Sequence, residues 1–194
     1  MPVVVDESIR MRKMAKLANS FNSVMDIGCA QQPNSYLNNK TVIGLDLVKT
    51  KMPNNYRYFY QMPLSEYNQK HETVECIVAG ELLEHLEDPL TFLKDCYQAI
   101  TADGVLILST PNPLSPIELI LNITLNKKYF YTKDHIMLFP QRWLIRLLEL
   151  AGFNNIKLYS GGFPLPGVGL VPCPRFMCHQ TIAVATKTPQ KENE

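Results

Sequence analysis

Two glutamates and a histidine stand close together in residues 80–86, whose sequence is GELLEHL. Positions i, i+3 and i+4 share one face of a helical turn, so a helix here would bring Glu81, Glu84 and His85 together. Carboxylate oxygens and imidazole nitrogens are ligands for divalent cations. The spacing therefore predicts a candidate divalent-cation site, and a second histidine, His135, follows later in the chain.

A glycine and an aspartate, each at the end of a short apolar run, indicate a nucleoside ligand. Gly28 lets the backbone turn sharply and come close to a ligand. Asp46 follows Gly28 by eighteen residues, where a carboxylate can accept hydrogen bonds from both hydroxyls of a ribose. A nicotinamide or flavin enzyme would carry further glycines in this turn, and Ala30 and Gln32 occupy their places. The pattern predicts nucleoside binding and disfavours a dinucleotide cofactor.

The elements that must position these residues alternate along the chain. Short, nearly all-apolar runs are typical of parallel strands buried on both faces, and they cover residues 24–27, 41–46, 74–79 and 105–108. Helix signals lie around them, over residues 6–21, 33–37, 90–100 and 141–151. This alternation predicts an α/β fold with a doubly wound sheet.

The pattern changes after Gly152. A strand near residues 156–159, a Gly/Pro-rich stretch over 161–174 and a strand over 180–185 predict an antiparallel pair that closes one edge of the sheet. Ligands of such sheets bind at the carboxyl ends of the strands. Those ends carry the residues that we expect to contact a cofactor: Asp26, Gly28, Cys29, Asp46, Leu47 and Gly80.

Several of these motifs, in this order, resemble the class I S-adenosylmethionine (SAM)-dependent methyltransferases. The segments that carry the resemblance are residues 24–28, 42–46, 74–86, 104–113 and the helix entry at 135–144. The resemblance implies one Rossmann-like domain with a seven-stranded sheet in the order 3-2-1-4-5-7-6, its last strand antiparallel. It also implies SAM as cofactor and S-adenosylhomocysteine (SAH) as product, with Gly28 near the methionine part and Asp46 on the ribose.

The chain departs from the family pattern after the third strand. The family often has an aspartate there that reads the adenine amino group, and this chain has Gln61 followed by Met62. The Gln61 side-chain oxygen could accept the same proton, with Met62 packing on the adenine ring. The resemblance thus adds Gln61 and Met62 to the expected cofactor residues.

The Glu-x-x-Glu-His turn with a later histidine is similar to two branches of the superfamily, the ubiquinone-biosynthesis and the small-RNA O-methyltransferases. Both imply metal ligands at Glu81, Glu84, His85 and His135. In other members the turn only orients the active-site loop, and His85 or His135 is then the candidate general base. We expect both histidines in the active site in either case.

The composition narrows the class of methyl acceptor. The 194 residues carry 19 basic and 18 acidic side chains, a net charge of +1, which argues against binding to nucleic acid through phosphate neutralisation. We expect transfer to a hydroxyl oxygen of a small molecule or saccharide. The alternatives are an RNA 2′-O-methyltransferase and a catalytically idle SAM-binding scaffold, for which the altered turn after Gly28 is the only support.

The remaining expectations concern organisation. Residues 1–187 are predicted to form a single domain, with a lid or insertion at 114–135 and a frayed tail at 188–194. The apolar helix over 116–125 is expected to act as a lid or as a homodimer contact. No apolar run approaches the roughly 20 residues of a membrane helix. Five scattered cysteines indicate a reduced, cytoplasmic protein.

Overall fold

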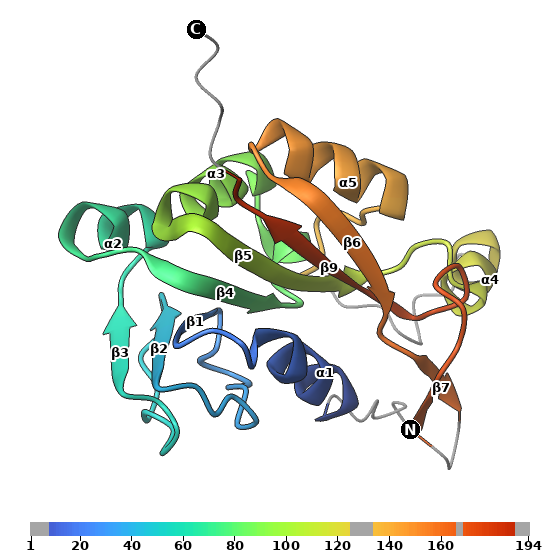
Figure 1. Ribbon diagram of the computed structural model, residues 1–194. Coiled ribbons are helices and arrows are strands. Elements are labelled where there is room, and N and C mark those ends of the chain that lie inside the picture. The colour runs from blue at the N-terminus through green and yellow to red at the C-terminus, as the bar shows by residue number, and fades with distance from the viewer. Residues whose placement is uncertain (1–7, 125–133, 166–168, 189–194) are drawn as a thin grey trace, which may run out of the picture.

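The computed structural model describes residues 8–124, 134–165 and 169–188. Their helices and strands alternate along most of the chain, as Figure 1 shows. In chain order the elements are α1 (Ser8–Ala18), β1 (Ser23–Ile27), β2 (Thr41–Asp46), β3 (Tyr58–Gln61), α2 (Leu64–Lys70), β4 (Val74–Gly80), the short 3₁₀ helix η1 (Leu83–His85), α3 (Pro89–Ala99), β5 (Ile100–Pro111), α4 (Pro116–Thr124), α5 (Gln141–Leu150), β6 (Asn154–Ser160), β7 (Phe163–Leu165), β8 (Gly169–Val171) and β9 (Gln180–Thr186).

Seven strands form one sheet in the order β3-β2-β1-β4-β5-β9-β6. The first five of these pair in parallel, and β9 runs antiparallel to both β5 and β6. Because β9 is the seventh strand of this sheet along the chain, the predicted order 3-2-1-4-5-7-6 with an antiparallel last strand is confirmed.

Helices cover both faces of the sheet, as a doubly wound fold requires (Figure 1). The larger core cluster packs α2, α3 and α5 on one face, and the smaller cluster packs α1 on the other. Neighbouring residues of β1 divide between the two clusters, with Met25 in the larger and Val24 in the smaller. This two-sided burial explains why the central strands are nearly all apolar.

The predicted helix over residues 33–37 is wrong. The backbone makes a single turn there, in which the Leu37 amide donates to the Asn34 carbonyl at 3.2 Å. The Asn34 side chain accepts a hydrogen bond from the Tyr36 amide at 3.1 Å, the local competition that draws asparagine into turns. The Gly/Pro-rich segment also differs from expectation, because β7 and β8 pair as a separate antiparallel hairpin.

Helix α4 stands apart from the core. None of its residues is buried, and Ile120 and Ile123 are 61 % and 81 % exposed. Its predicted role as lid or dimer contact stays a prediction, and residues 125–133 of the proposed 114–135 insertion lie outside the described residues, as does the tail from 189. No helix in the described part of the chain is long and apolar enough to cross a membrane. All five cysteines are free thiols, and the compartment stays a prediction.

Candidate active site

A cleft of about 700 Å³ lies at the carboxyl ends of the central strands. Six of the eight residues that we expected to contact a cofactor line it: Asp26, Gly28, Asp46, Leu47, Met62 and Gly80. The other two do not. Cys29 is buried with its sulfur 4.0 Å from the Leu45 carbonyl, and the exposed Gln61 donates its side-chain amide to the Leu47 carbonyl at 3.2 Å.

The turn after β1 depends on a glycine and a carboxylate. Gly28 has φ +75°, a left-handed conformation that L side chains rarely adopt, and its amide donates to the Leu45 carbonyl at 2.9 Å. Asp46 holds the turn from β2, because its Oδ2 accepts from the Ala30 amide at 2.7 Å and its Oδ1 from the Val48 amide at 2.8 Å. A carboxylate offers about four acceptor positions, so two remain for a ribose.

Asp26 supports the same turn from beneath. It is 5 % exposed, and its Oδ2 accepts from the Asn34 amide at 3.0 Å and from the Tyr56 hydroxyl. Burial raises the pKa of Asp26 to about 6, while the bonds from Tyr56 and Asn34 and the charge of Arg10 act in the opposite direction. Asp26 therefore works as an internal anchor at the floor of the cleft.

Arg10 is a site residue that the sequence reading missed. It lies on α1, is 3 % exposed, lines the cleft, and donates from Nη1 to the Ser109 hydroxyl at 2.9 Å. A Cβ at Gly80 would stand 2.3 Å from that nitrogen, so a side chain at this position would displace the guanidinium from where it lies. The signal was in the helical period, because Arg10 lies four residues before buried Met14 on the apolar face.

The structure does not bring Glu81 to the same face as Glu84 and His85. Glu81 has φ +50°, so the helical turn begins only at Leu83 and the assumed i, i+3, i+4 geometry does not apply. The Glu81 carboxylate instead accepts from the Ser109 hydroxyl at 2.9 Å, and its amide donates to the Ser109 carbonyl at 3.0 Å.

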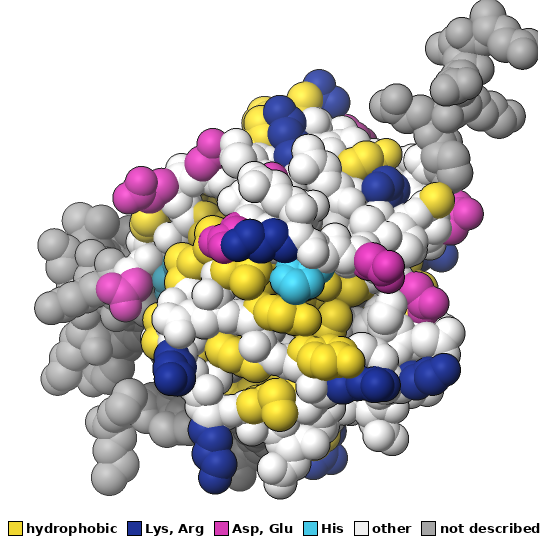
Figure 2. Space-filling model, turned by 90° about the vertical axis from the view of Figure 1, so that its left-hand side faces the viewer, with side chains coloured by type: hydrophobic (Ala, Val, Ile, Leu, Met, Phe, Trp, Pro, Cys, Tyr) yellow, Lys and Arg dark blue, Asp and Glu magenta, His cyan; other side chains and the backbone are white. Residues whose placement is uncertain are grey.

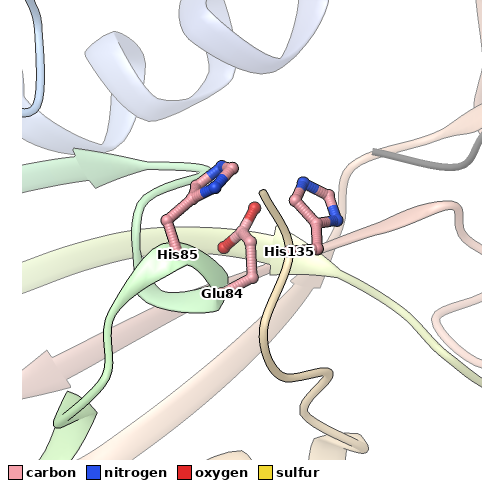
Figure 3. A group of neighbouring side chains, drawn as sticks. All are labelled: Glu84, His85 and His135. Carbon is pink, nitrogen blue, oxygen red and sulfur yellow. The ribbon is translucent and has the colours of Figure 1, made fainter. Parts of the chain in front are cut away.

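Three of the four predicted metal ligands do come together. Glu84, His85 and His135 each offer a ligand atom, and these atoms all lie within 4.8 Å of one another (Figure 3). His135 reaches the turn because the amides of Ile136 and Met137 donate to the Glu84 carbonyl at 2.8 and 3.3 Å. A hydrogen bond of 3.0 Å joins the His85 ring to the Asp134 carbonyl. His85 and Asp134 also line the cleft, so the group adjoins it.

The electrostatics of this group are unusual. Glu84 is fully buried, and neither of its carboxylate oxygens has a hydrogen-bond partner in the described part of the chain. Burial, together with the nearby charge of Glu81, raises the pKa of Glu84 well above its ordinary value, while the Thr110 side chain and the charge of Arg10 act in the opposite direction. Burial and the neighbouring His85 lower the pKa of His135, which favours its neutral, ligating form. A buried carboxylate without a partner is costly unless a cation or donor meets it.

The other two histidines lie apart from this group. On the side of the molecule where β3 and α2 lie, Figure 2 shows hydrophobic side chains gathered around a histidine. The ring contacts of that region join His71 to Tyr60 and Tyr67, with centroids 4.4 and 4.7 Å apart. His179 is buried, and its amide donates to the Gly162 carbonyl at 2.9 Å. The ring contacts make His71 a packing residue of the sheet edge, and His179 lies buried directly before β9.

Comparison with known proteins places this geometry in a family context. A sequence model described as a methyltransferase domain matches residues 7–158. The ubiquinone biosynthesis O-methyltransferase of Dinoroseobacter shibae is 28 % identical over 152 residues, which cover 69 % of this chain and 60 % of that protein. The chain thus matches less than two thirds of the length of that relative.

Solved structures share the fold at low identity. A SAM-dependent methyltransferase of Thermotoga maritima, described as a possible histamine N-methyltransferase, matches with a TM-score of 0.71 at 18 % identity, over 93 % of this chain and 89 % of that one. A small RNA methyltransferase matches with a TM-score of 0.69 at 14 % identity, and the match covers 100 % of this chain and 28 % of that one. An N-methyltransferase of Bradyrhizobium japonicum in complex with SAH matches with a TM-score of 0.60 at 14 % identity, and the match covers 93 % of this chain and 86 % of that one.

Proposed function

Because the chain belongs to the methyltransferase domain family, we propose that it is a class I SAM-dependent methyltransferase and that it methylates a hydroxyl oxygen of a small molecule or saccharide. The observation that carries this proposal is the group of Glu84, His85 and His135 beside the cofactor cleft. A group of this chemistry can deprotonate or polarise a hydroxyl. The relative from Dinoroseobacter shibae is by its name an O-methyltransferase, which supports the same choice of acceptor atom.

The cleft fits the three parts of SAM. We assign the buried guanidinium of Arg10 to the methionine carboxylate, because such pairs are strong when both groups leave water. The free acceptor positions of Asp46 suit the ribose hydroxyls. Leu47 lines the cleft although it is 67 % exposed, and with Met62 it offers an apolar surface for the adenine.

The group of Glu84, His85 and His135 fits a divalent cation. Glu84, His85 and His135 would hold it, and the unpartnered buried carboxylate of Glu84 is the feature that a cation would satisfy. Bound there, a divalent cation would lower the pKa of the acceptor hydroxyl. Glu81, the fourth predicted ligand, does not belong to this group, and its carboxylate accepts a hydrogen bond from the Ser109 hydroxyl instead.

Methyl transfer itself needs little covalent chemistry from the protein. SAM supplies a methyl group on a positively charged sulfur, and the transfer leaves a neutral thioether while the acceptor loses its proton. The chain has to hold acceptor oxygen, methyl and sulfur in line and to make the hydroxyl nucleophilic. In the alternative without metal, His85 or His135 accepts that proton as general base, since neutral imidazole has a suitable basicity.

The charges around the cleft favour a small acceptor over RNA. Five carboxylates line it: Asp26, Asp46, Glu81, Asp95 and Asp134. Among the described lining residues, Arg10 is the only lysine or arginine, and it is buried. A phosphate group that entered this cleft would meet an excess of carboxylates among the described lining residues.

The acceptor class is tested by a screen with radiolabelled SAM. Catechols, free sugars and a short RNA with a 3′ end are offered in parallel, and we expect label to enter the hydroxyl-bearing small molecules. Transfer to the RNA 3′ end alone would favour the small-RNA alternative and contradict the proposal. Tight SAH binding without turnover on any acceptor would favour the idle scaffold.

Cofactor binding is tested with Asp46→Ala and SAH. The substitution removes the ribose acceptor and the bond that holds the Ala30 amide, and each charge-assisted hydrogen bond contributes about 1.5–3 kcal/mol. We expect the dissociation constant measured by calorimetry to rise at least about thirtyfold. Glu72→Ala removes an exposed carboxylate of the same charge and should change it less than about twofold. Equal affinity of Asp46→Ala and the unchanged chain would refute the ribose assignment.

A further inference from the structure

The loop after Gly28 lacks the further glycines that such loops usually carry, and side-chain hydrogen bonds hold its backbone. Its residues 30–33 read Ala-Gln-Gln-Pro. Two carboxylates hold its backbone, Asp46 at the Ala30 amide and Asp26 at the Asn34 amide, with distances of 2.7 and 3.0 Å. The loop shape therefore depends on where these two carboxylates point.

Tyr56 fixes one of them. It precedes β3, is 3 % exposed, and packs in the core cluster on the α1 face of the sheet. Its hydroxyl donates to Asp26 Oδ2 and accepts from the Asn34 amide at 3.0 Å, so one oxygen joins the anchor to the loop it holds. A Cβ at Gly44 would stand 2.8 Å from the Tyr56 ring, which explains a glycine in the middle of buried β2.

The contacts continue from Asn34 to the cofactor side of α1. The Asn34 side-chain amide donates to the Met11 carbonyl at 3.1 Å, next in sequence to Arg10. From the other side, the Asn55 side chain donates to the carbonyls of Asn34 and Leu37 at 3.1 and 3.0 Å. Asn34 thus ties the loop to the helix that carries the buried guanidinium.

We propose that Tyr56 is a positioning residue for SAM, which acts through the Asp26 carboxylate and the Asn34 backbone to hold the 28–34 loop in its cofactor-receiving shape. Without the hydroxyl, the buried carboxylate loses a donor and is free to turn, and the loop and its link to α1 relax. The inference rests on the proposed function, because it presumes that SAM occupies the cleft.

The test is Tyr56→Phe, which keeps the ring and removes only the hydroxyl, with SAH as the probe. We expect the dissociation constant from calorimetry at pH 8 to rise about tenfold. Tyr67→Phe is the matched control: Tyr67 is also 3 % exposed and loses one bond, of 3.3 Å to the Glu72 carbonyl, on the opposite face. It should bind SAH within about twofold of the unchanged chain, even where both variants lose similar thermal stability.

A double substitution tests whether Tyr56 acts through Asp26. In an Asp26→Asn chain, removal of the Tyr56 hydroxyl should change SAH affinity less than about twofold, because the coupled partner is already altered. The same tenfold loss in both backgrounds would overturn the proposal. So would an unchanged affinity of Tyr56→Phe alone.

The pH dependence gives a readout that simple loss of stability would not move. The Tyr56 hydroxyl opposes the effect of burial on the pKa of Asp26, so its removal should raise that pKa further. The pH at which SAH affinity falls on acidification should therefore be higher in Tyr56→Phe than in the unchanged chain. The other groups that act on Asp26 and Tyr56 are Arg10, Cys29 and Asp46, and they stay in place in both chains.

Two further outcomes remain distinguishable. If the unchanged chain binds no SAH, the proposed function fails before any variant is tested. If Tyr56→Phe does not fold, Asn55→Ala takes its place, because it releases the same loop from a partly buried position, and it should raise the dissociation constant severalfold. Unchanged SAH affinity in Asn55→Ala would mean that the position of this loop does not affect SAH binding. The positioning role of Tyr56, which acts through the loop, would then be overturned.

Discussion

Replacing Glu84 by glutamine is expected to lower methyl transfer at least about a hundredfold, while SAH still binds as it does to the unchanged chain. Glutamine keeps the size of the side chain and removes the carboxylate that faces His85 and His135. Folding should not suffer, because the buried carboxylate has no hydrogen-bond partner to lose in the described structure. The rate is measured with radiolabelled SAM and the acceptor found by the screen, and folding by thermal unfolding.

Chelation separates the two roles that this group could have. If a metal ion activates the hydroxyl, exhaustive chelation should lower the rate of the unchanged chain about as much as Glu84→Gln does. Added Mg²⁺, Mn²⁺ or Zn²⁺ should then restore the rate of the unchanged chain and not that of Glu84→Gln. Glu87→Gln, an exposed change three residues further on, serves as control and should respond like the unchanged chain. A full rate without metal, abolished by His85→Ala or His135→Ala, would show the metal assignment to be wrong and support the general base.

The fold could be predicted because its signals are local. Apolar runs marked the central strands, and an aspartate followed by a proline, Asp88-Pro89, is a sequence signal for the start of α3. The Asp88 carboxylate indeed accepts from the Thr91 amide at 3.0 Å, with proline in the first turn. The order of the sheet followed from the family resemblance.

The site was predicted less completely, because its contacts join residues far apart in the sequence. Arg10 and Ser109 are 99 residues apart in the sequence, and the Arg10 side chain that joins them lies where a Cβ of residue 80 would stand if that residue were not glycine. The left-handed backbone of Glu81 also has no clear sequence signal, since glutamate seldom adopts it. The helical spacing that suggested Glu81, Glu84 and His85 on one face therefore held for Glu84 and His85 and failed for Glu81.

The second large effect follows from the proposed contact between Arg10 and the methionine carboxylate of SAM. Arg10→Met is expected to raise the dissociation constant for SAH about a hundredfold, because loss of one partner of a buried, hydrogen-bonded charge pair costs about 2–5 kcal/mol. Methionine keeps an unbranched stem and, within α1, loses the 3.9 Å hydrogen bond from Arg10 Nη1 to the Met14 sulfur. Arg12→Met removes the same charge from an exposed position on α1, where Arg12 stacks on Tyr36, and should change the affinity less than about twofold.

A second ligand tests which end of SAM Arg10 contacts. 5′-Methylthioadenosine keeps the adenosine and lacks the amino-acid part, so its affinity should be almost the same for Arg10→Met and the unchanged chain. Asp46→Ala should weaken both ligands, because the ribose is common to them. Gly80→Ala should reproduce part of the Arg10 effect on SAH alone, since its Cβ would displace the guanidinium from 2.3 Å away. Equal losses of both ligands in Arg10→Met would instead mean that Arg10 shapes the whole cleft, and the carboxylate assignment would be wrong.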